Sequence, residues 1–186
     1  MHDPLDVSRT PRLAAGAKRQ DRSSDAADRL GAAPVASHFG ALLRQEGPHA
    51  ALGYLNARTR FRFTGMYHTD GETLRNVEIF DRENPAVRCS GEIVPLRDTY
   101  CGIACRTVGP FVTRNAQRDH RLTTHAARNT VLSYCGVPIR LPSGAVWGTL
   151  CHVDQRPRLA PPDEPSMLEA SARELARWLC ASQRFA

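Results

Sequence analysis

The chain has 186 residues, with 25 basic and 19 acidic side chains and a net charge of +6. This length suits one domain with a tail. No apolar run approaches the ~18 residues of a membrane span, and the first residues lack the apolar stretch of a signal peptide, so we expect a cytoplasmic protein with no membrane partner. Lys18 is the only lysine, and no block of basic residues carries aromatic residues in the way that is typical of single-strand binders, which argues against nucleic-acid binding.

Six cysteines are spread along the sequence without the dense spacing of a disulfide framework. They are Cys89, Cys101, Cys105, Cys135, Cys151 and Cys180. A reducing cytoplasm keeps such thiols free, and most free cysteines serve as small buried apolar side chains. The sequence therefore predicts free thiols.

Residues 1–36 are rich in Ala, Arg, Asp and Ser and carry few apolar side chains. We predict a disordered N-terminal tail there, ahead of one domain covering residues 37–186. Ser37 suits the N-cap of a first helix, which ends before Pro48. That proline in turn suits the first turn of a second helix.

The segment RFRFTGMYHTDGETLRNVEIFDRE, residues 60–83, gives the clearest hairpin pattern. Apolar and polar residues alternate around the turn Asp70-Gly71, and the alternation places Leu74 and Phe80 on one face of the return strand. Residues 86–96 predict a third strand and residues 98–109 a short helix. Pro110 to Thr113 then forms a short strand, and the polar residues 115–128 form a loop with a helical turn.

Residues 136–154 read as two strands joined by a Pro-Ser-Gly turn, and both faces of each strand are largely apolar. Such strands are covered on both sides. Gly148 indicates a bulge or a close backbone approach. A final amphipathic helix starts at about Pro165. The fold class is therefore α+β, a central antiparallel sheet of five to six strands flanked by N- and C-terminal helices.

Two cysteine patterns are candidates for chemistry. Cys101 and Cys105 lie one helical turn apart, but the sequence offers no second close pair to complete a zinc site, so we predict no metal. Cys151 and His152 are neighbours on a strand and point to opposite faces of the sheet. They cannot act on each other as nucleophile and base, so the hairpin is read as scaffold and no catalytic residue is assigned.

The polar segment with His120 and His125 suggests a lid over the sheet, where Asp119, Arg121 and His125 could hydrogen-bond a ligand. Aromatic residues follow the predicted strands and the short helix. They are Phe63, Tyr67, Phe80, Tyr100 and Trp147. From the residues alone, we reach a single α+β module with a small pocket.

Three motifs make the chain resemble the GAF domain family from about Ser37 to Leu179. They are F-T-G-x-Y at residues 63–67, S-Y-C-G-V-P-I at residues 133–139 and G-T-L-C-H-x-D at residues 148–154. The resemblance implies an antiparallel sheet with helices on one side and a small-molecule pocket on the other. It also implies a stand-alone bacterial sensory module that dimerises through its terminal helices, with no output domain of its own.

The resemblance places an unidentified ligand between the sheet and a lid of residues 99–127. The expected pocket residues are Phe63, Tyr67, Phe80, Tyr100, Cys101 and His125. No particular cofactor is implied, because members of the family bind cyclic nucleotides, tetrapyrroles, haem, amino acids or nothing known. A further alternative is a GAF fold used only for dimerisation or for binding a signalling partner.

The enzymatic branch that the chain resembles is free methionine-(R)-sulfoxide reductase. Phe63 and Tyr67 fall near that family's aromatic cage, and Cys89 and Cys101 fall near two of its three cysteines. The third cysteine should lie around residues 124–127 and is absent. The bilin-binding branch is echoed by Cys151-His152, but on a strand rather than in a lid. The cyclic-nucleotide signature N-K-x-x-x-F is not found.

Overall fold

The computed structural model describes residues 22–88 and 90–182. Its helices and strands, in chain order, are α1 (Arg22–Gln45), α2 (Pro48–Ala57), β1 (Phe63–Thr69), β2 (Thr73–Asp81), β3 (Ile93–Pro95), α3 (Tyr100–Thr107), β4 (Phe111–Thr113), β5 (Ser133–Arg140), β6 (Val146–Asp154) and α4 (Glu164–Ser182). Short 3-10 turns connect some of them, at Leu96–Asp98, Ala116–Arg118, His120–Leu122 and Ala126–Asn129. Over these described ranges, no helix is long and apolar enough to cross a membrane.

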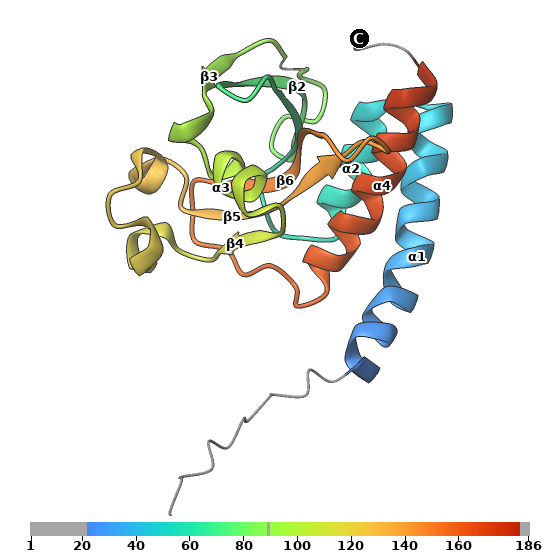
Figure 1. The fold of residues 1–186 in the computed structure, drawn as a ribbon, viewed down its shortest axis with the longest axis horizontal. Helices are drawn as coiled ribbons and strands as arrows, with labels where there is room; N and C mark the ends of the chain where they lie inside the picture. Colours follow the sequence, from blue (N-terminus) through green and yellow to red (C-terminus); the bar gives the residue numbers. More distant parts are fainter. Residues whose placement is uncertain (1–21, 89, 183–186) are drawn as a thin grey trace, which may run out of the picture.

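The six strands form one antiparallel sheet in the order β3-β2-β1-β6-β5-β4. This confirms the predicted α+β class and strand number. Figure 1 shows α1, α2 and α4 on one side of the sheet, and α3 with the short turns of residues 116–129 on the other. The sheet therefore has a helix-covered face and a loop-covered face.

Each face of the sheet has its own apolar core. On the helix face, Phe39, Leu52 and Leu168 pack against Met66 and Leu150. On the loop face, a smaller cluster gathers around α3 and the middle of β5 and β6. The strands β5 and β6 contribute buried residues to both clusters, which confirms that they are covered on both sides.

The first helix begins at Arg22 rather than at Ser37, so residues 22–36, predicted to belong to the tail, are helical. Ala32, Val35 and Ala36 are buried in the core of the helix face. The sequence pattern did not reveal this apolar face of the helix, because alanine contributes little to an apolar pattern. Alanine is nevertheless the strongest helix former. Residues 1–21 of the predicted tail lie outside the described residues.

The predicted third strand is shorter than expected. The regular strand covers Ile93–Pro95, which pairs with β2, and two further backbone hydrogen bonds join Gly91 and Glu92 to Asn76 of β2. Cys89 lies outside the described residues. The predicted polar loop of residues 115–128 is built from 3-10 turns capped by the side chains of Asn115, Asp119 and His125. These caps fix the loop over the sheet without a regular helix.

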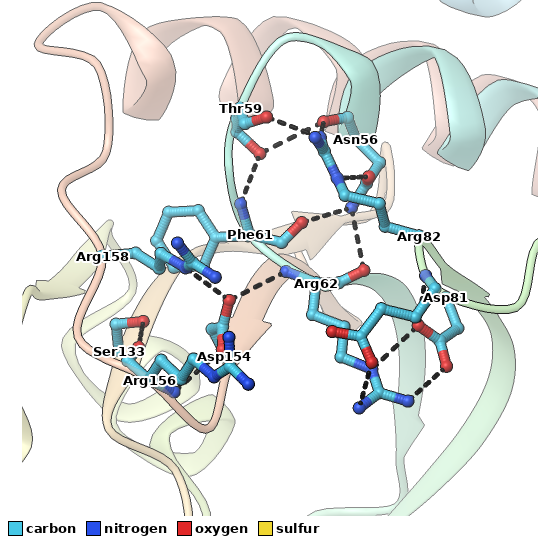
Figure 2. A network of polar contacts seen from close by, with 11 residues as sticks. Asn56, Thr59, Phe61, Arg62, Asp81, Arg82, Ser133, Asp154, Arg156 and Arg158 are labelled. Carbon is cyan, nitrogen blue, oxygen red and sulfur yellow. Dashed lines mark hydrogen bonds and ion pairs between the residues drawn. The ribbon is translucent and has the colours of Figure 1, made fainter.

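The connection between α2 and β1 is fixed by buried polar side chains (Figure 2). The carboxylate of Asp154, at the end of β6, accepts hydrogen bonds from the backbone N–H groups of Arg62 and Arg156, at 3.1 and 2.8 Å. The Arg158 guanidinium lies 2.7 Å from the same carboxylate. Asp154, at the end of β6, thus links the loop before β1 to the loop after β6.

Candidate functional site

The loop face of the sheet contains a cavity of about 510 Å³. Its floor comes from Tyr67 of β1, Tyr134 of β5 and Val153 of β6, and its walls come from residues 92–101 and 126–131. Strand alternation brings these floor residues together, because β1, β6 and β5 are adjacent in the sheet. A cavity of this size fits a small organic molecule.

Tyr100 is positioned by the start of α3. The Thr99 side chain caps this helix by accepting from the Gly102 N–H at 3.2 Å, and the Tyr100 hydroxyl donates to the Val131 carbonyl at 3.1 Å. Burial raises the pKa of Tyr100 to about 12, so its hydroxyl stays protonated at neutral pH. One hydrogen bond therefore joins the two walls of the cavity.

Cys101 and Tyr134 line the cavity, and the Cys151 thiol is buried beside them. The Tyr134 hydroxyl donates to Cys101 Sγ at 3.4 Å, and all of Cys101, Tyr134 and Cys151 belong to the buried cluster of this face. Hydrogen bonds from the Cys151 thiol and from Tyr134 lower the pKa of Cys101, although burial opposes this. Burial raises the pKa of Cys151 instead.

The charged residues at the cavity are acidic. Glu92 and Asp98 stand on its wall, and the described residues that line it include no Arg, Lys or His. The site therefore favours a neutral or cationic ligand over an anionic one. No group of three or more potential metal-ligating side chains occurs among the described residues, so nothing in this part of the chain suggests a metal centre.

Three of the six predicted pocket residues line the cavity. These are Tyr67, Tyr100 and Cys101. His125 lies next to it, with its ring centroid 4.7 Å from that of Tyr100, and burial lowers its pKa, so it is neutral at pH 7. Phe63 is not among the lining residues, and the Arg62 guanidinium covers its ring at 4.7 Å.

Phe80 was predicted on the pocket face and lies instead on the helix face. Its ring contacts α2, where it is 5.4 Å from the His49 ring, and a Cβ at Gly53 would lie 2.9 Å from it. The cause is a register shift, since Met66 pairs with Glu78 but Tyr67 pairs with Asn76. The extra residue reverses the alternation, so Leu74 and Phe80 face opposite sides.

The predicted lid residues separate in the structure. Arg121 pairs with Asp119 at 2.6 Å and donates to the Val112 carbonyl at 2.7 Å, which places both beside the edge strand β4. There they line a second hollow of about 740 Å³ with Arg114 and Arg158. Of the three predicted lid residues, only His125 remains beside the tyrosine-lined cavity.

Tyr134 is a cavity residue that the sequence did not single out. In the segment S-Y-C-G-V-P-I every position is apolar or small, so periodicity could not assign Tyr134 to either face. A signal was available in Gly136, two residues further on the same face. A Cβ there would lie 2.4 Å from the Tyr134 hydroxyl oxygen, so glycine leaves the room that the tyrosine ring occupies.

The architecture defines a class: an α+β domain that holds a small-molecule cavity between an antiparallel sheet and a loop layer. A sequence profile for the GAF domain matches residues 40–177. The chain belongs to the GAF domain family. No match was found among curated proteins.

Solved structures with the same fold share little sequence identity with this chain. A protein described as a GAF sensor from Burkholderia vietnamiensis is 17% identical with a TM-score of 0.64. The match covers 84% of this chain and 98% of the Burkholderia chain. Free methionine-R-sulfoxide reductase from Neisseria meningitidis, solved with its substrate, is 17% identical with a TM-score of 0.63. The match covers 85% of this chain and 93% of the reductase chain. A GAF domain of an Acinetobacter phosphoenolpyruvate-protein phosphotransferase is 12% identical with a TM-score of 0.63. The match covers 83% of this chain and 94% of that GAF domain chain.

Proposed function

We propose that this chain is a sensory module that binds one small molecule in the cavity of the loop face. The observation that carries the proposal is the cavity itself, about 510 Å³ bounded by Tyr67, Tyr100 and Tyr134. Apolar walls with a few hydrogen-bonding groups are typical of small-molecule sites. Membership of the GAF family supports the same class of function.

The lining chemistry suggests what the ligand carries. Burial raises the pKa values of Tyr67 and Tyr100, so both present neutral hydroxyls and aromatic faces. The faces attract cations, and Glu92 and Asp98 add negative charge at the wall. The proposed ligand therefore has an apolar or aromatic body and a neutral or cationic polar group.

The helices on the opposite face of the sheet are the part of the fold through which ligand binding would change dimerisation. Helices α1 and α4 pack against each other and against the sheet, on the side opposite the cavity. We expect a homodimer through these terminal helices, with ligand occupancy changing the dimer equilibrium. This equilibrium is measured by light scattering with and without ligand.

The binding test begins with native mass spectrometry of freshly purified full chain, compared with its denatured mass. A non-covalent addition identifies a bound molecule directly. Thermal-shift titrations with tyramine and with 4-hydroxyphenylacetate then test the charge preference, because the two share an aromatic body and differ in charge. Free methionine sulfoxide, with a thiol reductant, tests the reductase alternative by turnover.

We expect tyramine to raise the unfolding midpoint more than 4-hydroxyphenylacetate does. Tyr67→Ala and Tyr100→Ala should each remove the shift. Phe80→Ala is the matched control, since it truncates an aromatic residue of the same hairpin on the opposite face of the sheet. If tyramine shifts the unfolding midpoint equally in all three variants and no molecule co-purifies, the result would argue for a module that only binds a partner protein.

A further inference from the structure

Two thiols from elements far apart in the sequence belong to the buried cluster beneath the cavity, which Cys101 lines and Cys151 does not. Cys101 lies in the first turn of α3 and Cys151 in the middle of β6. Directly across from Cys151 is Gly136 of β5. A Cβ at that glycine would lie 2.5 Å from the Cys151 Cβ and 2.4 Å from the Tyr134 hydroxyl oxygen, so the backbone leaves space for this group.

The two thiols are unequal. The Tyr134 hydroxyl donates to Cys101 Sγ at 3.4 Å, and the neighbouring Cys151 thiol and this hydroxyl lower the pKa of Cys101, which favours its thiolate form. The position of Cys101 near the N-terminus of α3 acts in the same direction. Burial holds Cys151 in its protonated form and raises the pKa of Cys105 to about 11. A thiolate beside a protonated thiol is the arrangement of a reactive cysteine and its resolving partner.

Access to Cys101 is through the cavity. Cys101 lines it but is only 5% exposed, and Cys151 is fully buried behind it. Glu92 and Asp98 on the wall disfavour anions. Because Cys101 lines the cavity and Cys151 does not, a small, neutral oxidant in the cavity meets Cys101 first.

We propose that Cys101 and Cys151 form a redox pair that reduces a small hydroperoxide and closes a disulfide across the floor of the cavity. The Cys101 thiolate attacks one peroxide oxygen, so that an S–O bond forms, the O–O bond breaks, and the leaving oxygen takes up a proton as an alcohol or water. The Cys151 sulfur then attacks the sulfenic acid at Cys101. An S–S bond forms, the S–O bond breaks, and the hydroxide leaves as water with the proton of Cys151.

In this reaction the two thiols together lose two electrons, which reduce the hydroperoxide. A dithiol reductant in the cell restores the thiols by exchange. The new bond would join α3 to β6 under Tyr134, so it changes the floor on which a ligand rests. The reaction itself does not depend on which ligand the cavity binds.

The test uses the reduced full chain, treated with up to one equivalent of hydrogen peroxide, then denatured and alkylated. Peptide mass mapping follows each cysteine with time. We expect the first product to be an intramolecular Cys101–Cys151 disulfide, formed before Cys105, Cys135 or Cys180 is modified. Cys151→Ser should instead accumulate a sulfenic acid at Cys101, which dimedone traps.

Cys105→Ser is the matched control, because it lies one turn further along the same helix, and it should oxidise like the unchanged protein. Tyr134→Phe removes one donor to the thiolate and should slow the first step by about 3- to 10-fold. Circular dichroism checks that each variant is folded, and the unchanged protein gives the decisive order of oxidation without any variant.

A first disulfide between any other pair, an intermolecular disulfide, or oxidation of Cys101 no faster than that of Cys105 would overturn the proposal. Failure here is separable from failure of the proposed ligand binding. Tyramine binding is measured on fully reduced protein, and peroxide oxidation is measured without tyramine.

Discussion

The Nε2 atom of His152 lies 3.0 Å from Oε1 of Glu164, and both side chains are fully buried on the helix face of the sheet. The other ring nitrogen, Nδ1, lies 2.7 Å from the Thr64 hydroxyl oxygen. That oxygen accepts from the Asn56 amide at 2.9 Å, and Arg82 fixes the amide orientation. The consistent arrangement has Thr64 donating to Nδ1 and the Nε2–H donating to Glu164.

This network gives His152 a structural role. It joins the first residue of α4 to the two central strands and to α2. The neighbouring Cys151 belongs to the cluster of the opposite face, as the strand alternation predicted. The hairpin that carries both is therefore scaffold on one face and cavity floor on the other.

Glu164→Ala is expected to lower the free energy of unfolding by about 2–4 kcal/mol, because the His152 N–H then loses its acceptor inside the core. Glu169→Ala, one turn further along α4 and only half-buried, should change it by less than about 0.5 kcal/mol. Urea unfolding followed by circular dichroism measures both. Equal midpoints for the two variants would contradict the structural role of the network.

Asp154→Asn should destabilise the protein by about 1–3 kcal/mol. Asp154 is 2% exposed and its carboxylate receives two backbone N–H groups and the Arg158 guanidinium. An amide replaces one acceptor oxygen by a donor, so at least one of these buried donors loses its partner. Asp163→Asn, a half-buried residue before α4, is the control and should unfold at the same urea concentration as the unchanged protein.

The sheet, its hairpins and the final helix could be predicted because each has a strong local pattern. Two features depend on information that no local pattern carries. The early start of α1 is stabilised by packing of Ala32 and Val35 in the core with α4. The position of Phe80 depends on the register shift between β1 and β2 at Met66 and Tyr67, because one extra residue in β2 reverses the face of every residue beyond it and the alternation in the sequence does not show where that residue falls.

The candidate site was predicted less completely than the fold. Tyr67, Tyr100 and Cys101, three of the residues that the family resemblance gave for the pocket, line the cavity, and ligand binding there stays a prediction. Tyr134 was missed because both faces of β5 are buried. In such a strand, burial does not distinguish the cavity side from the core side, and only the three-dimensional register does.

Asp81 gives the fold a dependence on acid. Its two carboxylate oxygens accept from the Arg62 guanidinium at 2.9 and 2.8 Å, and this hydrogen bonding lowers the pKa of Asp81 to about 2. A folded-state pKa below the unfolded value of about 3.9 means that stability is present above that value and is lost as the pH falls toward 2.

Urea midpoints measured from pH 5 down to pH 2 therefore should fall for the unchanged protein, and fall less for Asp81→Asn, since the variant has no proton to take up at this position. Asp70 also has a pKa lowered to about 2 by hydrogen bonds within its own turn, so it contributes to the slope in both proteins. Identical slopes in the two proteins would show that the Asp81–Arg62 pair does not contribute.

Gly148→Ala should prevent normal pairing of the two central strands. A Cβ at Gly148 would lie 1.8 Å from the Tyr67 carbonyl oxygen and 3.0 Å from the His68 Cα, and these backbone atoms cannot move without opening the pairing of β1 with β6. The sequence indicated a bulge or a close backbone approach here, and the structure has the close approach together with a register shift beside it, since Ile139 pairs with Gly148 but Arg140 pairs with Val146.

We expect Gly148→Ala to cost about 3 kcal/mol or more and to disturb Tyr67 at the floor of the cavity. Gly109→Ala is the matched control, because its nearest neighbour would be the Thr107 carbonyl oxygen at 3.8 Å. Thermal unfolding and the yield of folded protein compare the two. If both variants unfold at the same temperature, the central strands can separate at Gly148 at little cost, and the rigid floor assumed for the cavity is wrong.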